Sequence, residues 1–200
     1  MTVAINGEDL ISLADFKTLA EITSSQHDAK LTELIDSVSQ LVKTYCGQSF
    51  LDYYSSAKTE FHTKNFDTHI VELSESPVVS ITSVGERNSP SSSYTTLTEN
   101  TDWVLDSTTD SLYRMSGSLY KNWKTGPNVV KVIYKAGYSE LPQDLRLAVV
   151  DLIMYYHKNE QKQRQTIAGA TIQNQNTSST RNSVAFPDHI KRVLDLYKVY

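Results

Sequence analysis

Cysteine and long hydrophobic runs are nearly absent from this sequence. Cys46 is the single cysteine among 200 residues, so the chain can form neither an internal disulfide nor a cysteine-cluster metal site. No apolar run approaches the roughly 18 residues that a membrane-spanning helix needs, and the first residues lack the basic and apolar regions of a signal peptide. These absences predict a soluble globular protein that is synthesised in the cytoplasm and has no membrane partner.

Positive charge is also scarce. Lys and Arg number 19 and Asp and Glu number 23, which gives a formal net charge of −4 and an isoelectric point near 5.7. Proteins that hold nucleic acids tightly rely on Lys and Arg to displace counterions from the phosphates. The charge balance therefore argues against a protein whose main task is to grip DNA or RNA, although nucleic acid could pass close to it.

The common motifs of enzymes and nucleotide-binding proteins are missing as well. Neither of the phosphate-binding patterns G-x-x-x-x-G-K-[ST] and G-x-G-x-x-G occurs, nor does a nucleophile elbow, an H-E-x-x-H zinc motif or an EF-hand loop. The sequence thus predicts no cofactor and no catalytic site. An enzyme stays a third alternative, because residues distant in sequence can meet in a folded site.

The segment 139–164 predicts one long central helix. Pro142 suits the first helical turn, and Asp144 follows where a carboxylate interacts favourably with the helix dipole. Cations gather toward the other end of the helix, at Lys158, Lys162 and Arg164. These three residues could face DNA phosphates in a channel, but stabilisation of the helix terminus explains them equally well.

Two apolar stripes run along this helix. A turn of about 100° per residue places four residues on one stripe. They are Leu145, Val149, Leu152 and Tyr156. A second set falls on nearly the opposite side, at Leu147, Val150 and Met154. The first stripe is an ordinary core face, whereas the second can be covered by the same domain or by a neighbouring subunit, and its spacing alone does not decide between them.

Shorter helices are predicted on either side. Ser12 and Asp15 form a near match to a capping box ahead of a first helix, and an apolar stripe over residues 26–46 predicts a second helix that ends at Gly47. A last helix over 187–200 has one apolar stripe, at Ile190, Val193, Leu194 and Tyr197. Helices shorter than about 12 to 15 residues are marginal in water, so this one needs a partner surface on its own bundle or on another protein.

The segment 48–138 has a hydrophobic period of two, interrupted by turn residues, and it predicts short strands. They run from Lys58 to Thr63, His69 to Leu73, Val78 to Val84, Tyr94 to Thr98, Trp103 to Leu105, Leu112 to Met115 and Val129 to Tyr134. The short spacing between them favours antiparallel pairing. The segment 165–186 has no period and predicts a polar loop.

These elements predict an α+β fold. We expect a helical bundle made of two N-terminal helices in residues 1–47, the long central helix and the short C-terminal helix. A small antiparallel β-sheet or barrel is inserted between the N-terminal helices and the central helix, because the strand patterns all fall between them.

Two histidines form the one candidate metal site. If Lys64 to Asp67 make the turn of a hairpin, His62 and His69 face each other across two paired strands. Two ligands without a third are too few to hold a metal firmly, and two partly exposed hairpin histidines are the plainer interpretation. The sequence therefore predicts no metal, with His62 and His69 as weak candidates.

Several segments occur in an order that is typical of one family. The most specific is Tyr134-Lys-Ala-Gly-Tyr138, a strand end that leads into the proline-started helix at Leu141. The others are Tyr45-Cys-Gly47 after the paired helices, Ile70-Val-Glu-Leu73, Pro77 to Val84, and Phe186-Pro-Asp-His-Ile190. In this arrangement the chain resembles the adaptor, or head-completion, proteins of the head-to-tail connector of tailed bacteriophages.

The resemblance implies a structural role in the virion. Proteins of this family form a ring, typically twelve-fold, beneath the portal protein, extend the DNA channel and offer a docking surface to a stopper or tail component. Double-stranded DNA would be a partner only in transit. The residues then take three roles: Ile190, Val193, Leu194 and Tyr197 dock to the portal, Leu147, Val150 and Met154 contact the neighbouring subunit, and Lys158, Lys162 and Arg164 line the channel.

A different class of protein stays open as an alternative. The chain has 12 tyrosines, 5 phenylalanines and 2 tryptophans, and tyrosine is favoured at interfaces that are apolar on one side and wet on the other. The tyrosines and tryptophans near residues 94–123 could serve a β-module for receptor or carbohydrate binding on a phage tail. A β region rich in aromatic strand residues also accounts for many of them.

Overall fold

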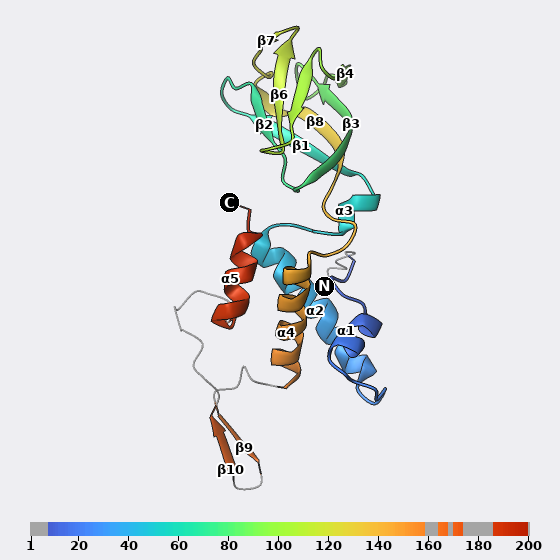
Figure 1. Cartoon of the computed structure of the whole chain (residues 1–200). Coiled ribbons are helices and arrows are strands. Elements are labelled where there is room, and N and C mark those ends of the chain that lie inside the picture. Colours follow the sequence, from blue (N-terminus) through green and yellow to red (C-terminus); the bar gives the residue numbers. More distant parts are fainter. Residues whose placement is uncertain (1–7, 159–163, 168–169, 174–185, 200) are drawn as a thin grey trace. The chain divides into compact units, whose positions relative to one another are not determined.

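The protein divides into two compact units, which are described separately. The computed structural model describes residues 8–158, 164–167, 170–173 and 186–199. One unit comprises Met1–Gln48 and Leu141–Tyr200 and contains the long helices; the other comprises Ser49–Glu140 and contains two β-sheets (Figure 1). We call them the helical unit and the β unit.

The helical unit is built from the helices that the sequence predicts. They are α1 (Leu13–Leu19), α2 (Asp28–Cys46), α4 (Gln143–His157) and α5 (Asp188–Leu196). Ser12 caps α1 as expected, since its hydroxyl oxygen accepts a 3.1 Å hydrogen bond from the Asp15 backbone N–H. Gly47 follows α2 in the left-handed conformation, at φ 72°, which glycine adopts without steric cost.

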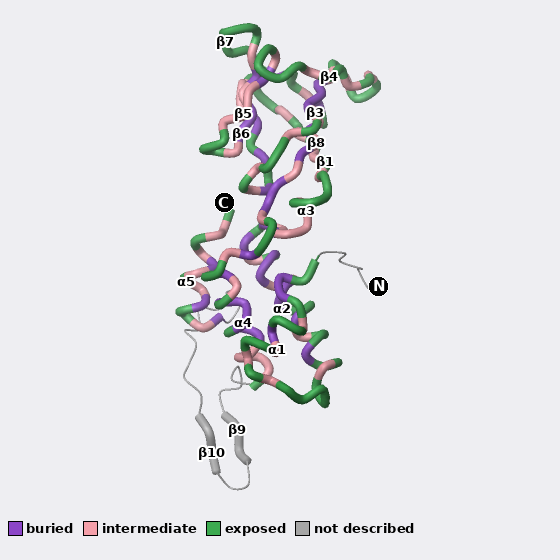
Figure 2. Tube along the Cα trace, turned by 45° about the vertical axis from the view of Figure 1, so that its right-hand side comes forward, coloured by how far each residue is buried: buried purple, intermediate pink, exposed green. Residues whose placement is uncertain are grey.

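One stripe of α4 forms the centre of the helical core. Leu145, Val149 and Leu152 are buried, as their spacing predicts, and Ile153 joins them. Helices α2, α4 and α5 pack against one another, and α1 packs against α2. The other helices contribute Phe16, Leu31, Ile35, Val38, Val42, Ile190 and Leu194 to the buried set (Figure 2). Removing these apolar side chains from water is the main force that holds the short helices together.

The predicted central helix is too long at its C-terminal end. Helix α4 ends at His157, with Lys158 as its C-cap. Arg164 instead begins β9 (Arg164–Ile167), so it is not part of the cationic helix end that the sequence predicts. Lys162 lies outside the described residues. A run of lysines and glutamines fits a helix by composition, so the sequence alone does not mark this stop.

The predicted polar loop is also wrong in part. Strand β9 pairs in antiparallel register with β10 (Ala170–Gln173), and Ala170 lies opposite Ile167. Threonine and isoleucine on both sides of an Ala-Gly pair favour a hairpin. That signal spans only a few residues among many polar ones, so the period of two is hard to recognise in the sequence.

The β unit contains all seven predicted strands, one further strand and a short helix. The helix is α3 (Asp52–Ser55). The strands are β1 (Lys58–Lys64), β2 (Ile70–Glu72), β3 (Val78–Glu86), β4 (Thr95–Leu97), β5 (Trp103–Asp106), β6 (Ser111–Ser116), β7 (Leu119–Tyr120) and β8 (Gly126–Ala136). The sequence does not predict α3 and β7, because each is too short to show a period.

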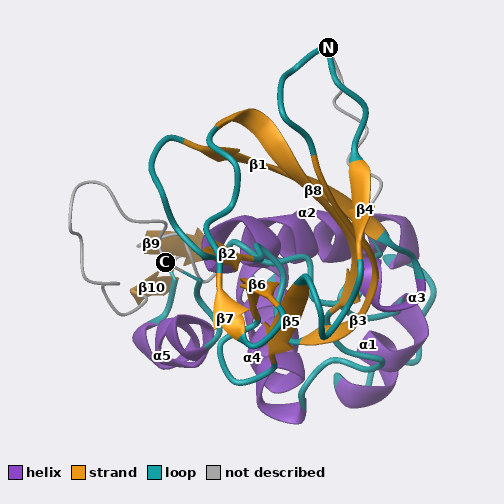
Figure 3. Cartoon of the chain, turned by 90° about the horizontal axis from the view of Figure 1, so that it is seen from above, coloured by secondary structure: helices purple, strands orange, loops and turns teal. Residues whose placement is uncertain are grey.

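The strands of the β unit form two open antiparallel sheets. One has the order β1-β8-β3-β4, and the other has the order β2-β6-β5 with β7 paired to β6 (Figure 3). Within the described residues neither sheet closes into a barrel. The α+β prediction is therefore confirmed, with an inserted sheet structure in place of a barrel.

A buried ion pair connects the two sheets. Arg114 on β6 places its Nη2 atom 3.5 Å from Glu86 Oε2 on β3, and both side chains are almost completely buried. Arg114 Nη1 also donates to the carbonyl oxygens of Asp102, at 2.6 Å, and Met115, at 2.7 Å. The buried apolar core of the β unit includes Val84, Leu112, Trp123 and Val132, and the Arg114 guanidinium carbon lies 5.6 Å from the centroid of the Trp123 ring. A charge in such surroundings is tolerated only when it is paired and hydrogen-bonded.

Candidate interaction surfaces

A groove opens between α1 and α4 on the surface of the helical unit. Its volume is about 810 Å³, and it is open to solvent. The end of α1 contributes Leu19, Ala20 and Glu21. Helix α4 and its C-cap contribute Gln143, Asp144, Arg146, Leu147, Val150, Asp151, Met154 and Lys158. The whole second apolar stripe of α4 therefore lines one groove.

Apolar side chains face solvent from both walls of this groove. Leu147 on α4 is 62% exposed and Leu19 on α1 is 53% exposed, whereas Val150 is only 6% exposed. Met154 is half-buried. The second stripe is thus divided: Val150 belongs to the chain's own core, and Leu147 lacks cover within the described part of its own unit. Scattered exposed leucines are ordinary, but two on facing walls of a groove are typical of a protein-binding surface.

Charged residues form the rim of the groove. Arg146 of α4 lies 3.6 Å from Asp15 of α1 and so joins the two walls, although an exposed pair of this kind contributes only about 1 kcal/mol or less. The carboxylates of Glu21 and Asp151 have no ion-pair or hydrogen-bond partner in the part of the chain that the structure describes. Within the described residues the rim therefore has two unpaired negative charges, at Glu21 and Asp151, and one unpaired positive charge, at Lys158.

The structure places half of the predicted docking stripe of α5 inside the protein. Ile190 is 2% exposed and Leu194 is completely buried, because both pack into the chain's own helical core. They are therefore not on the surface, contrary to the expectation for a docking face. Val193 and Tyr197 are half-buried, and docking through them stays a prediction.

Polar contacts also hold α5 to its own unit. The Tyr197 hydroxyl donates to Asp144 Oδ1 on α4 at 2.7 Å, and the Tyr45 hydroxyl donates to Asp195 Oδ1. Each hydrogen bond stabilises the ionised carboxylate and so lowers the pKa of Asp144 and of Asp195. Helix α5 therefore has its partner surface on its own bundle.

The outer face of α5 carries a residue that sequence reasoning missed. Leu196 is 77% exposed, and His189 and Arg192 lie on the same face. Leu196 falls outside the predicted apolar stripe of its helix. An isolated leucine on an otherwise polar face is the signal that could have indicated it.

Cys46 is not a reactive site. The residue is buried at the end of α2, and burial is the main cause that raises the pKa of its thiol to about 12. A thiol with such a pKa holds almost no thiolate at neutral pH, which is the nucleophilic form.

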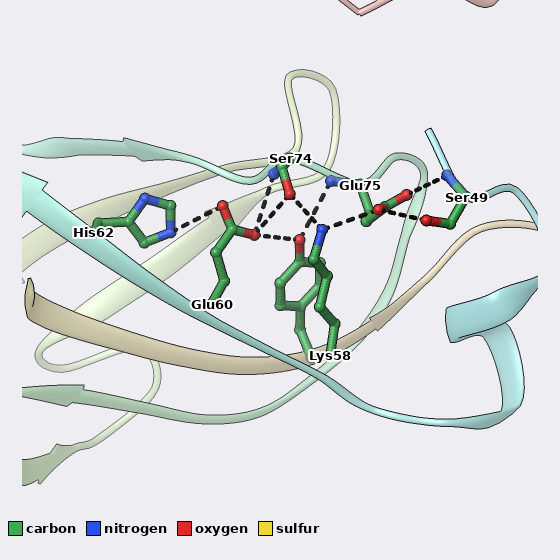
Figure 4. Close-up of polar contacts among 7 residues, drawn as sticks. Ser49, Lys58, Glu60, His62, Ser74 and Glu75 are labelled. Atoms are coloured by element: carbon green, nitrogen blue, oxygen red, sulfur yellow. Dashed lines mark hydrogen bonds and ion pairs between the residues drawn. The ribbon is translucent and has the colours of Figure 1, made fainter. Parts of the chain in front are cut away.

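A polar network joins β1 to β8 and to the segment between β2 and β3 (Figure 4). Glu60 Oε2 accepts hydrogen bonds from the Tyr134 hydroxyl at 2.6 Å and from Ser74 Oγ at 3.0 Å. Burial, together with the adjacent Glu60 carboxylate, raises the pKa of Tyr134. The phenol therefore stays protonated and remains a donor to Glu60.

The same network continues to the start of the β unit. Glu75 accepts hydrogen bonds at 2.9 Å from Lys58 Nζ and from both the backbone N–H and the hydroxyl of Ser49 (Figure 4). Lys58 Nζ also donates to Ser74 Oγ at 2.6 Å. The carboxylates and the ammonium group are all paired. We therefore interpret the network as structural: it holds Ser49 to the sheet that contains β1 and β8.

His62 and His69 do not face each other as the hairpin hypothesis requires. His62 on β1 lies opposite Val130 of β8, whereas His69 precedes β2, whose partner is β6. The local hairpin does not form because β1 pairs with a strand far along the chain. His62 Nε2 lies 3.5 Å from Glu60 Oε1. Among the described residues, no group of three or more His, Cys, Asp or Glu side chains is placed to hold a metal ion.

An exposed aromatic cluster lies at β7. The rings of His69, Tyr113 and Tyr120 are mutually close, with centroid distances of 4.8 to 5.8 Å. Tyr120 and its neighbour Leu119 are both exposed. These residues form an apolar tip on the β unit that is suited to contact with another molecule.

The predicted DNA-contacting cations are not gathered at one helix end. Lys158 lines the groove of the helical unit, and Arg164 belongs to β9. No helix within the described ranges is long and apolar enough to cross a membrane.

Comparison with known proteins identifies similar chains. A family model described as "HCP: Head completion protein" matches residues 9–200. The head completion protein of Escherichia phage T5 is 33% identical over 64 residues, which cover 32% of this chain and 35% of that protein. The match thus spans about a third of the relative's length.

Solved structures share the fold at low sequence identity. A chain from the neck of an empty GTA particle, computed with C6 symmetry, has a TM-score of 0.61 and 15% identity, and the match covers 96% of this chain and 90% of that chain. A chain from the neck of the native GTA particle, computed with C12 symmetry, has a TM-score of 0.60 and 16% identity, with 100% and 93% covered. At such identities the similarity shows the fold alone.

Proposed function

The chain belongs to the head completion protein family, and from that premise we propose that it is an adaptor of the connector that joins the head of a virion to its tail. Its place is the head-tail junction. We infer a structural role and not a catalytic one, because the polar network of the β unit pairs its charged groups with one another and the single thiol is buried.

The groove between α1 and α4 is the observation that carries this proposal. Leu147 and Leu19 each expose more than half of their surface there, although Val150 in the same groove is buried. A subunit that leaves apolar groove walls open is suited to assembly, in which a neighbour covers them. The proposed subunit interface therefore remains Leu147, Val150 and Met154, of which Val150 is buried.

We propose that copies of this chain form a ring. Two structures with the same fold come from necks computed with C6 and C12 symmetry; both support a ring, and the C12 neck favours twelve copies. On one side the ring would meet the portal protein, and on the other a stopper or tail component. The exposed tip at Leu119 and Tyr120 is suited to one of these contacts.

The charge of the chain favours DNA passage over DNA binding. Each copy has a formal net charge of −4, and tight binding to phosphates requires many unpaired Lys and Arg residues. A ring of such copies would let double-stranded DNA slide through its channel.

Reconstitution of heads tests the adaptor role. DNA-filled heads that lack this protein should lose DNA and fail to join tails, and addition of the purified full chain should restore both DNA retention and tail joining. Heads that retain DNA and join tails equally well without the protein would contradict the proposal.

A further inference from the structure

Two surfaces of the helical unit are exposed within its described residues and are complementary in apolar character and charge. One is the groove between α1 and α4, with exposed Leu147 and Leu19. The other is the outer stripe of α5, which we define as His189, Arg192 and Leu196, with Val199 just beyond the helix end. The spacing of three and four residues places His189, Arg192 and Leu196 on one helical face, opposite the buried Ile190 and Leu194, and Val199 is also exposed.

The two surfaces lie on different sides of α4. Helix α5 packs against α4 and α2, and none of its residues lines the groove. In Figure 1 and Figure 3 alike, α4 stands between α5 and α1. With α5 held to Asp144 by Tyr197 and to Cys46 by the Val199 backbone N–H, the stripe cannot reach the groove of its own chain.

Charge also matches between the two surfaces. The groove rim carries the carboxylates of Glu21 and Asp151, and the stripe carries the guanidinium group of Arg192. None of these three side chains has an ion-pair or hydrogen-bond partner among the residues that the structure describes. Within the same described residues the groove also carries the unpaired ammonium group of Lys158, so its unpaired acidic side chains outnumber its unpaired cation by two to one. The stripe therefore presents a cation and exposed apolar residues to a groove with an excess of anions and exposed apolar residues.

We propose that the outer stripe of α5 of one copy docks into the α1–α4 groove of the next copy. Leu196 would fill the space beside Leu147 and Leu19, and Arg192 would pair with Asp151 or Glu21. This is a helix-in-groove contact. Because the two surfaces differ and lie on opposite sides of α4, the contact is head-to-tail, and repetition with a constant rotation closes a ring. The inference rests on the proposed ring.

Disulfide trapping tests this contact in assembled particles. Leu196→Cys and Leu147→Cys in the same full-length chain should, after mild oxidation, give covalent multimers in steps up to the full ring, because each bond links two neighbours. Each single cysteine variant should give no such ladder. The matched control combines Leu196→Cys with Glu33→Cys, since Glu33 is exposed on α2 outside the groove, and it should stay monomeric on a denaturing gel.

Charge reversal provides a second measurement. Arg192→Glu should weaken ring formation by about tenfold or more, and a second change of Asp151→Arg in the same chain should restore much of it. Lys30→Glu, which reverses an exposed cation on α2, should leave assembly unchanged. Thermal unfolding of each monomer checks that the fold is retained.

The outcomes separate this contact from the ring itself. A ring at the head-tail junction with no disulfide ladder between positions 196 and 147, and without rescue by Asp151→Arg, would overturn the contact and leave the adaptor role standing. Absence of any ring would overturn the adaptor role. If Arg192→Glu abolished binding to purified portal rings and left contact between copies intact, the outer stripe of α5 would be a portal-binding surface. The proposed contact between copies would then be wrong.

Discussion

At the scale of single residues, buried polar groups decide how the β unit is held together. Arg114 and Glu86 link the two sheets in an apolar core. The Glu60 and Glu75 carboxylates accept hydrogen bonds from residues in separate parts of the chain. Composition alone could not reveal these pairs, because each partner lies far away in sequence and either residue would also suit an exposed strand position.

Replacement of Arg114 with Met should destabilise the protein strongly. The change leaves the Glu86 carboxylate buried without its cation and removes the donor to the carbonyls of Asp102 and Met115. Loss of one partner of a buried pair costs about 3 to 5 kcal/mol. Urea denaturation measures the free energy of unfolding, and Lys124→Met, at an exposed lysine, should change it by less than about 0.5 kcal/mol. Equal effects of the two substitutions would show that the pair does not stabilise the fold.

Stability should fall as the pH drops below the ordinary range of histidine. Burial is the main cause that lowers the pKa of His62 below its usual value of 6.5, and Lys64 and Lys58 add to it while Glu60 opposes it. The unfolded chain therefore binds a proton more readily than the folded chain, so stability is complete above pH 6.5 and declines as the pH falls toward the folded pKa.

The variant His62→Gln should flatten this dependence. Burial lowers the pKa of His157 in the same direction, so part of the slope should remain in the variant. Thermal unfolding of both proteins between about pH 7.5 and about pH 5, a range of roughly one unit or more around the ordinary histidine pKa, gives the comparison. An unchanged slope would exclude His62 as its source.

At the scale of helices and strands, local periodicity predicted most elements and few of their partners. The stripe of Leu145, Val149 and Leu152 predicted the core face of α4, and Ser12 predicted the start of α1. The pairing of β1 with β8 was not predictable, because strand partners depend on contacts across the whole β unit. For the same reason the prediction that placed His62 opposite His69 is wrong.

The sequence predicted the α4 wall of the groove but not the α1 wall. The spacing of Leu147, Val150 and Met154 indicated a second apolar face on α4, but the spacing could not show that Val150 is covered by its own unit while Leu147 is exposed. The other wall, at Leu19 to Glu21, depends on how α1 packs beside α4. No local pattern contains that information.

Substitutions on the two faces of α4 should affect different properties, ring assembly on one face and monomer stability on the other. Met154→Glu places a charge in the solvent-open groove, so it should hinder ring formation more than it lowers monomer stability. Leu145→Ala removes completely buried apolar volume and should cost the monomer about 2 to 5 kcal/mol. Sedimentation of assembled rings and urea denaturation of the monomer separate the two effects. Unfolding of the Met154→Glu monomer would instead assign Met154 to the internal core.

At the scale of the whole molecule, the order of elements was more informative than any single residue. The family was indicated by ordinary turn and strand segments in sequence, such as Tyr134 to Tyr138 before the proline-started α4, and the family model covers residues 9–200. What the sequence could not supply is the set of surfaces that remain open after folding. Those surfaces, the α1–α4 groove and the outer stripe of α5, arise only when the helices pack as one unit.

An image of the neck of the intact particle by electron cryomicroscopy tests the central claim most directly. The account predicts a ring of this chain around the DNA channel between the portal and the tail, with the α1–α4 groove of each copy covered by its neighbour. A neck in which this chain is absent, or a ring in which Leu147 and Leu19 still face solvent, would contradict it.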